Sequence, residues 1–304
     1  MTILVSGLIN IETTLRVDGF PIAYEPVRYP FFGVSSTVSG VGYNVAKALT
    51  TLGSRVDFLS MIGSDSVRVS VRRALDEDGI ESTYVLDGVR ETAQSVILYD
   101  GAGRRQINVD LKDIQDTAYP EDRFEAALAS CSLAVLCNIN FSRPMLSRAK
   151  AAGIPVATDV HAIADLEDDY NRDFMAYADM LFMSHEKLPC APREWIDAVM
   201  GRYDAGIVAI SMGADGVLLA VRADGTVTHI PAVNVRPVIT TIGAGDALFS
   251  AFIHGYHRGG DPYEAMRKAV VFAAYKIGAA GAAEGFLDET RLHVLYAQLT
   301  KETP

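Results

Sequence analysis

The chain has 304 residues, of which 49% are hydrophobic and 21% are charged, so it can bury a large core as one big α/β domain. Its net charge of −11 argues against a broad nucleic-acid interface, which needs a basic face. No apolar run approaches the roughly 20 residues that span a bilayer, so we expect no membrane partner.

The start of the chain, Met1 to Leu8, lacks a basic flank and is too short for the apolar core of a signal peptide. It is typical of a first β-strand. Cys131, Cys137 and Cys190 form no Cys-x-x-Cys pair, which favours reduced thiols. These features predict a cytoplasmic protein.

Short β-branched or aliphatic runs then alternate with longer helical patterns. This alternation predicts a mostly parallel sheet with helices on both faces, whose binding site gathers at the carboxyl ends of the strands. The predicted elements are, in chain order, a helix over 44–52, a strand over 56–62, a helix over 66–78, a hairpin over 95–99 and 104–109, a helix over 123–130, a strand over 133–137, a helix over 143–152, strands over 155–160 and 180–183, a helix over 194–203, a strand over 206–212, and helices over 246–257 and 264–279.

Two segments, 20–38 and 83–113, interrupt the alternation. Both are rich in turns and in polar–apolar alternation rather than in helical patterns. The second contains the hairpin, whose loop carries Gly101 and Gly103.

A short glycine-rich turn, Thr240 to Ala247, runs directly into an apolar helical pattern and places Asp246 on the first turn of that helix. The small residues Gly243, Ala244 and Gly245 let backbone N–H groups face open space, where the helix dipole favours an anion. A carboxylate beside an anion-binding turn is what phosphoryl transfer to an alcohol requires. A loop that ends in a helix-capping Asp is the alternative interpretation.

A second glycine-rich segment lies upstream. Gly40 and Gly42 would allow a ligand to approach the backbone, and Asn44 offers donors and acceptors to hydroxyl groups. Half of a dinucleotide-binding fingerprint is the alternative, which Val45 disfavours because it stands where the third Gly or Ala would be.

These two segments resemble the two signatures of the ribokinase, or PfkB, carbohydrate kinases, in the right order and over essentially the whole chain. The resemblance implies one ribokinase-like domain over residues 1–304, with a central mostly parallel sheet flanked by helices on both faces. It also implies a small β lid, formed by approximately 13–38 and 83–113, that often supplies a homodimer contact. The implied activity is ATP-dependent transfer of a phosphoryl group, with Mg²⁺, to a primary hydroxyl of a small sugar or sugar derivative.

The resemblance assigns roles to residues of this sequence. Asp246 would be the base, and Gly243, Ala244 and Gly245 the anion hole. Asn138 and Asn140 end a predicted strand and are either sugar contacts or turn residues. The expected acceptor contacts are Asn10, Glu12, Gly40, Gly42, Asn44, Asn138 and Asn140.

The nucleotide side follows from a Gly-x-x-Gly loop after the predicted strand 206–212, and from a small-residue helix that flanks adenine in the family. The expected nucleotide contacts are Ser211, Gly213, Gly216, Thr241, Phe272 and Lys276. Glu186 would contact Mg²⁺ through water, although it is offset by one position from the family's Asn-x-x-Glu motif.

Thr240 replaces a family Asp that helps to bind a monovalent cation in some members, which leaves potassium activation in doubt. Two alternatives to a sugar acceptor or to kinase activity stay open. A nucleoside acceptor is suggested by Tyr43 and by aromatic residues of the lid, Tyr24, Tyr29, Phe31 and Phe32, on which a base could stack. A non-catalytic sugar or nucleotide sensor is a function of another class, and a nicotinamide-dependent enzyme ranks below it.

Overall fold

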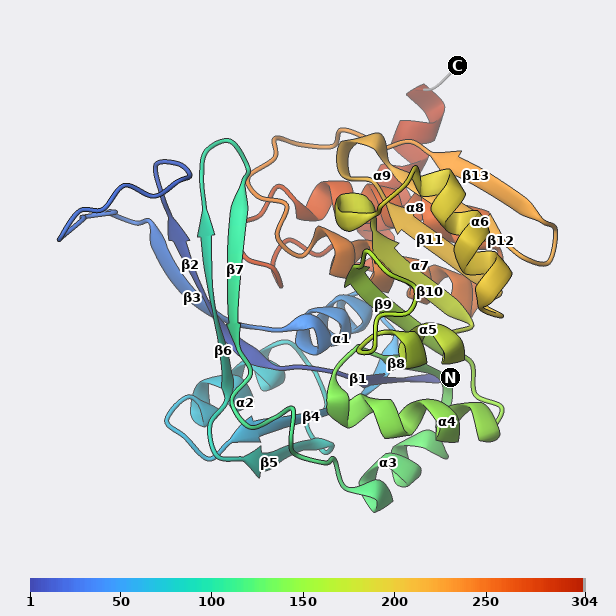
Figure 1. The fold of residues 1–304 in the computed structure, drawn as a ribbon, viewed down its shortest axis with the longest axis horizontal. Helices are drawn as coiled ribbons and strands as arrows, with labels where there is room; N and C mark the ends of the chain where they lie inside the picture. Colours follow the sequence, from blue (N-terminus) through green and yellow to red (C-terminus); the bar gives the residue numbers. More distant parts are fainter. Residues whose placement is uncertain (303–304) are drawn as a thin grey trace.

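A computed structural model describes residues 1–302 as two sheets and their flanking helices (Figure 1). The large sheet has the strand order β13-β12-β11-β10-β9-β8-β1-β4-β5, and the strands from β11 to β5 are all parallel. Its strands are β1 (Thr2–Ser6), β4 (Arg55–Gly63), β5 (Val85–Val89), β8 (Cys131–Leu136), β9 (Val156–Ala162), β10 (Met180–Ser184), β11 (Ile207–Ser211), β12 (Val217–Val221) and β13 (Thr226–Ile230).

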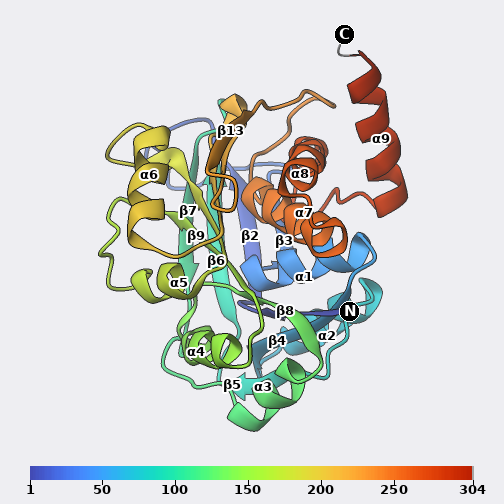
Figure 2. The same ribbon diagram turned by 90° about the vertical axis from the view of Figure 1, so that its right-hand side faces the viewer.

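Helices cover both faces of the large sheet, as predicted, and each face has its own apolar core (Figure 2). One core contains α1 (Val41–Thr51), α2 (Arg68–Glu77), α7 (Ala244–Gly259), α8 (Pro262–Lys276) and α9 (Glu289–Glu302). The other contains α3 (Glu121–Leu128), α4 (Arg143–Ala151), α5 (Arg172–Tyr177) and α6 (Pro192–Arg202). Within residues 1–302, no helix combines the length and apolarity needed to cross a membrane.

The small sheet stands beside the large one in Figure 1 and has the strand order β3-β2-β6-β7. Its strands are β2 (Asn10–Arg16), β3 (Val34–Ser39), β6 (Ala93–Tyr99) and β7 (Arg105–Asp110). β2 pairs antiparallel with β3 and parallel with β6, so two distant segments of the chain build it together. β5 lies within the expected lid segment 83–113 but belongs to the large sheet, where it pairs in parallel with β4 and forms one edge.

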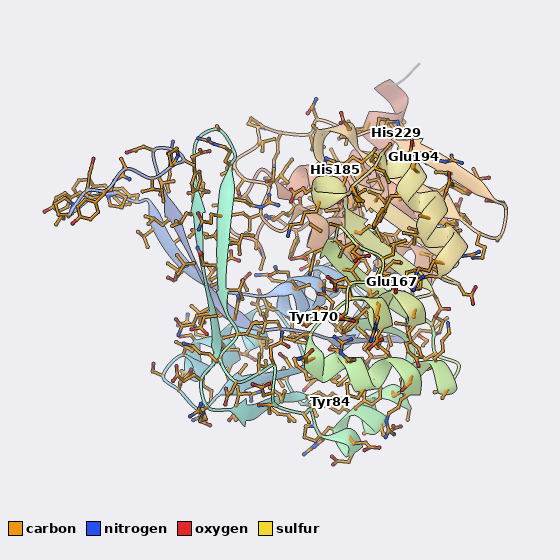
Figure 3. The ribbon with its side chains drawn as sticks, viewed as in Figure 1. Tyr84, Glu167, Tyr170, His185, Glu194 and His229 are labelled. Atoms are coloured by element: carbon orange, nitrogen blue, oxygen red, sulfur yellow. The ribbon has the colours of Figure 1, made fainter. Side chains whose placement is uncertain are left out.

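The 17–33 segment between β2 and β3 extends away from the rest of the protein (Figure 1). Side chains with aromatic rings gather at its tip (Figure 3), and they are strongly exposed. These residues are Tyr24, Tyr29, Phe31 and Phe32.

Helix boundaries near the site follow local backbone rules. α7 begins after Gly243, which has a φ of 74°, and ends at Gly260, which has a φ of 73°; both are left-handed conformations that favour glycine. α8 begins at Asp261, whose side chain accepts hydrogen bonds from the N–H groups of Tyr263 and Glu264. The turn and helix predicted around Asp246 are therefore present, with the helix starting two residues earlier, at Ala244.

Candidate active site

The two glycine-rich segments meet at the amino ends of α1 and α7. The Asn44 amide Nδ2 donates to Asp246 Oδ2 over 2.7 Å. This bond brings together the two residues whose chemistry the sequence analysis singled out most strongly. The α7 amino terminus also places Asp246 beside Gly243–Gly245, as the turn predicts.

Gly40 and Gly42 allow a close approach within the chain's own backbone. A β-carbon on Gly42 would lie 2.4 Å from the carbonyl carbon of Gly7, and one on Gly40 would lie 2.5 Å from the carbonyl oxygen of Leu8. These glycines therefore position α1, and with it Asn44, against the end of β1. Their predicted contact with a ligand stays a prediction.

Burial raises the pKa of Asp246. The hydrogen bond from Asn44 and the charges of His161 and Lys276 lower that pKa, whereas the nearby Asp159 carboxylate raises it. A raised pKa makes Asp246 a stronger base than an ordinary aspartate, which suits it to accept a proton.

A line of buried polar groups leads from the small sheet to Asp246. The Ser39 hydroxyl lies 3.2 Å from both Glu12 Oε2 and Asn44 Oδ1, and the Asn10 amide donates to Ser95 Oγ over 3.0 Å. The remaining oxygens, Asn10 Oδ1 and Glu12 Oε1, are buried without a hydrogen-bond partner among the described residues. Two unpartnered acceptors suit a ligand that presents hydroxyl donors.

The two other predicted acceptor contacts are engaged with the protein. Asn138 Nδ2 donates to Asn171 Oδ1 over 2.9 Å, and Asn140 Nδ2 donates to the Gln115 carbonyl over 3.1 Å. Asn140 also borders a cavity of about 360 Å³ between α3 and α4. Both amide nitrogens therefore have partners within the protein, and a sugar contact at Asn138 or Asn140 stays a prediction.

Arg105, which the sequence analysis did not identify, connects β7 of the small sheet to two loops at the edge of the large sheet. Its Nη1 donates to Thr241 Oγ1 over 2.7 Å, and its Nη2 lies 3.3 Å from Glu186 Oε1. Nearby, Ile97 of β6 packs against Ile242 and Ala282. The small sheet is thus held against the turn that precedes α7.

The carboxylates around this turn could hold waters of a metal ion. Asp159 Oδ2 would lie 3.9 Å from a β-carbon on Gly245, and Glu186 is 57% exposed at its side chain. In the part of the chain that the structure describes, no group of three or more His, Cys, Asp or Glu residues could hold a metal by itself. These residues therefore fit Mg²⁺ that takes most of its ligands from phosphate and water.

The nucleotide-side predictions divide into open and buried positions. A β-carbon on Gly213 would have no described neighbour within 4 Å, whereas one on Gly216 would lie 2.1 Å from the Ile230 carbonyl oxygen. Ser211 lies beside η2 (His185–Lys187), since His185 Nδ1 is 3.0 Å from its carbonyl oxygen; Figure 3 labels His185. Gly213 is thus open to a ligand, and Gly216 is needed for packing against the end of β13.

Phe272 and Lys276 are fully buried, which contradicts their predicted contact with adenine. Phe272 stacks on Phe286 with ring centroids 5.6 Å apart. Lys276 Nζ donates to the carbonyl oxygen of Ile242, directly before the anion-binding turn. Phe272 therefore faces the apolar core, and Lys276 faces the turn that precedes α7.

Tyr43 is also unavailable to a ligand. Its side chain is 2% exposed, and its hydroxyl donates to Asp78, which Lys47 contacts at 3.0 Å. Tyr43 therefore packs α1 against α2, and the expectation that it stacks on an acceptor base was wrong.

Comparison with known proteins agrees with this arrangement. The profile of the "pfkB family carbohydrate kinase" matches residues 2–289. A deoxyribokinase of Salmonella typhi is 28% identical over 298 residues, covering 92% of this chain and 94% of the relative. A 1-phosphofructokinase of Haloferax volcanii is 30% identical, covering 88% and 86%. The solved structure of the microbiome-derived acarbose kinase Mak1 is 26% identical with a TM-score of 0.86, covering 97% and 98%.

Proposed function

Since the chain belongs to the pfkB family of carbohydrate kinases, we propose that it transfers the γ-phosphoryl group of ATP to a primary hydroxyl of a small sugar or sugar derivative. The observation that carries this proposal is the contact between Asn44 and Asp246 beside the Gly243–Gly245 turn. It joins a base to an anion-binding helix terminus, which is the arrangement that phosphoryl transfer needs.

The acceptor would bind between the small sheet and α1. Asn10 Oδ1 and Glu12 Oε1 would each accept a hydrogen bond from a sugar hydroxyl, which would satisfy two buried oxygens. Burial raises the pKa of Glu12, and the Ser39 hydroxyl opposes that effect. Neutral hydroxyl groups suit such a site better than an anionic group would.

The chemical step uses Asp246 as the base. Its carboxylate accepts the proton of the acceptor hydroxyl while the acceptor oxygen bonds to the γ-phosphorus, and the bond from that phosphorus to the bridging oxygen of ADP breaks. Backbone N–H groups at Gly243–Gly245 and the dipole of α7 would stabilise the negative charge of the phosphoryl oxygens.

The nucleotide would lie over Ser211, Gly213 and Thr241, at the carboxyl edge of the large sheet. Mg²⁺ would neutralise charge on the phosphate oxygens, and Glu186 would hold one of its waters. A cytoplasmic location for this kinase stays a prediction from the sequence.

The sugar acceptor is preferred over a nucleoside. Tyr43, on which a base was expected to stack, is buried, and the 17–33 segment, which carries the exposed rings, extends away from the large sheet (Figure 1). A non-catalytic sensor would not need the half-buried Asp246 that Asn44 holds in place. The names of the relatives, which include a deoxyribokinase and an acarbose kinase, support a sugar acceptor without identifying it.

We also propose a homodimer through the small sheet. Apolar side chains on one face of this sheet are 43–57% exposed. They are Val34 and Val96, which share the face of the sheet opposite to that of Ile97. Contact with a second copy of the chain would remove this apolar surface from water. Light scattering after size exclusion should give twice the 32.8 kDa chain mass, and a monomer at micromolar concentration would contradict this.

The activity is tested by ADP formation from Mg-ATP with a panel of pentoses, hexoses, deoxysugars, phosphosugars, oligosaccharides and nucleosides. Asp246→Asn keeps the shape of the side chain and removes the base, so its kcat should fall by at least about 1,000-fold while ATP binding persists. Turnover that survives in Asp246→Asn would contradict the assigned base. ATP binding without turnover of any acceptor would support the sensor.

A further inference from the structure

Lys276 is a fully buried cation on the last turn of α8. Its Nζ donates to the carbonyl oxygen of Ile242, the residue before Gly243. Three carboxylates act on it electrostatically: Asp246 from α7, Glu12 from β2 and Glu284 from the segment after α8; Arg236 is the nearby like charge. Burying an ammonium group costs folding free energy unless the group is hydrogen-bonded and paired with carboxylates, as it is here.

The hydrogen bond fixes the orientation of one peptide group. The carbonyl of Ile242 and the N–H of Gly243 belong to the same planar peptide, in which a trans bond makes them point in opposite directions. Because the carbonyl points at Lys276, the Gly243 N–H points away from it. The Ala282 backbone packs closely against this peptide, since a β-carbon on Gly243 would lie only 2.4 Å from the Ala282 carbonyl oxygen.

We propose that the Lys276 ammonium is a built-in cation of the phosphoryl-transfer site, which holds the Ile242–Gly243 peptide with its N–H toward the transferred phosphoryl group. This inference rests on the kinase function proposed above. Lys276 is a positioning residue, since it acts through the peptide and through its charge and does not touch the substrate. A protein that carries this cation in its own chain should need no added monovalent cation.

The environment of Lys276 gives this proposal a pH signature. Burial lowers the pKa of Lys276 to about 8, against the attraction of Asp246, Glu12 and Glu284. The ammonium form is therefore lost as the pH rises through about 8. If that form orients the turn, kcat/KM should fall over the same range.

The test compares Lys276→Ala with Lys276→Met in tetramethylammonium, potassium and ammonium chloride at equal ionic strength. Lys276→Ala should lose at least about 100-fold in kcat in tetramethylammonium chloride, the size of a lost oxyanion-hole donor. Ammonium or potassium ions should restore at least tenfold, because each can enter the space that the side chain leaves. Lys276→Met fills that space and should not respond, and wild type should vary less than twofold among the three salts.

Lys268→Ala is the matched control, since Lys268 lies on the same helix and its ammonium contacts Glu264 and the ring of Tyr296 rather than the turn before α7. It should behave as wild type. In Lys276→Ala rescued with potassium, the decline of kcat/KM above pH 8 should disappear, because potassium does not titrate. A structural role alone would produce neither this change nor rescue.

Several results would overturn the proposal: a folded Lys276→Ala with kcat within threefold of wild type, a loss that no cation reverses, or strong activation of wild type by potassium. Turnover of no acceptor by wild type would instead contradict the kinase function. In that case the melting temperature still tests the cation site, because ammonium should raise it more in Lys276→Ala than in wild type. If Lys276→Ala does not fold, the pH profile of Lys276→Met replaces the rescue experiment. Its kcat should be at least about 100-fold below that of wild type, and a decline of its kcat/KM through pH 8 like that of wild type would overturn the proposal.

Discussion

The amide of Asn44, on the first turn of α1, donates to the carboxylate of Asp246, on the first turn of α7, over 2.7 Å. The two helices pack together, so the bond lies at the junction between the acceptor side and the phosphate side of the site. The amide oxygen Oδ1 of Asn44 also accepts a hydrogen bond from the Ser39 hydroxyl, which limits rotation of the Asn44 side chain. Asn44 therefore sets both the position and the basicity of Asp246.

Replacing Asn44 by Leu should reduce kcat/KM more at low pH than at high pH. The lost hydrogen bond normally lowers the pKa of Asp246, so its removal lets burial raise that pKa further and protonates the base over a wider range. We expect a loss of about 10- to 100-fold at pH 6.5, the effect of a hydrogen bond to a charged group, and a smaller loss at pH 8.5.

Asn44→Asp is the companion variant, because it keeps the side-chain shape but places a second carboxylate beside Asp246. Its acidic limb should move to higher pH than that of Asn44→Leu. Profiles of kcat/KM against pH measure both effects. Equal losses at every pH would show that Asn44 acts on binding alone.

Arg105 should hold the small sheet against the site. Its contacts with Thr241 and Glu186 lie at the exposed surface, so removing them should cost ~1 kcal/mol, the upper end for exposed ion pairs. In Arg105→Ala we expect faster amide exchange over residues 93–110 and an acceptor KM that rises roughly 3- to 10-fold, as that energy implies.

Gln106→Ala is the control for this variant, since Gln106 is the next residue of β7 and points to the opposite face of the strand. Its exchange and KM should match those of wild type. Unchanged exchange in Arg105→Ala would mean that the contact between Ile97, Ile242 and Ala282 is sufficient to hold the sheet.

The sequence predicted the main parallel sheet and the turn at Gly243–Asp246 because both have strong local patterns. It missed the antiparallel strands β12 and β13, the short helix α5 and the terminal helix α9. The β12 strand continues directly from a loop that was interpreted only as a nucleotide contact, and α9 lies beyond residue 279, the last residue assigned to a predicted element. Local patterns therefore predicted the centre of the fold better than its edges.

The positions of Asp246 and Asn44 were predictable because each follows a glycine-rich segment with a distinct local pattern, and the structure brings the two side chains into contact. Lys276 and Phe272 were misplaced because a helix of small and aromatic residues looks the same whether it faces a ligand or the core. Arg105 could not be predicted at all, since its contact with Thr241 depends on how the two sheets lie relative to one another.

Gly42→Ala tests the backbone contact between α1 and the end of β1. The added β-carbon would lie 2.4–2.7 Å from three backbone atoms of Gly7, and backbone cannot move aside cheaply. We expect the melting temperature to fall by about 3–10 °C, as overpacking of a core does, and kcat/KM to fall because Asn44 is displaced.

Gly259→Ala is the matched control at the end of α7, where a β-carbon would have no described neighbour within 4 Å. Alanine favours a helix over glycine, so this variant should melt at the same or a slightly higher temperature. A Gly42→Ala protein as stable as wild type would mean that the backbone of Gly7 can shift.

His254 should make stability depend on pH away from the active site. Its ring is buried between Ser54, whose hydroxyl lies 2.8 Å from Nδ1, and Glu289, whose Oε1 lies 3.4 Å from Nε2. Burial lowers the pKa of His254, although Glu289 acts against this effect. Below its ordinary value of 6.5, the unfolded chain therefore binds a proton more readily than the folded one, and stability is lost as the pH falls.

The measurement compares melting temperatures at pH 7.5 and pH 5.5. His254→Gln cannot take up the proton, so its loss between these pH values should be smaller than that of wild type, even if it is less stable at both. His229→Gln, at an exposed position on β13, should keep the wild-type difference. Because other groups titrate equally in wild type and His254→Gln, an identical pH difference in the two proteins would show that the bond to Glu289 offsets the burial of His254.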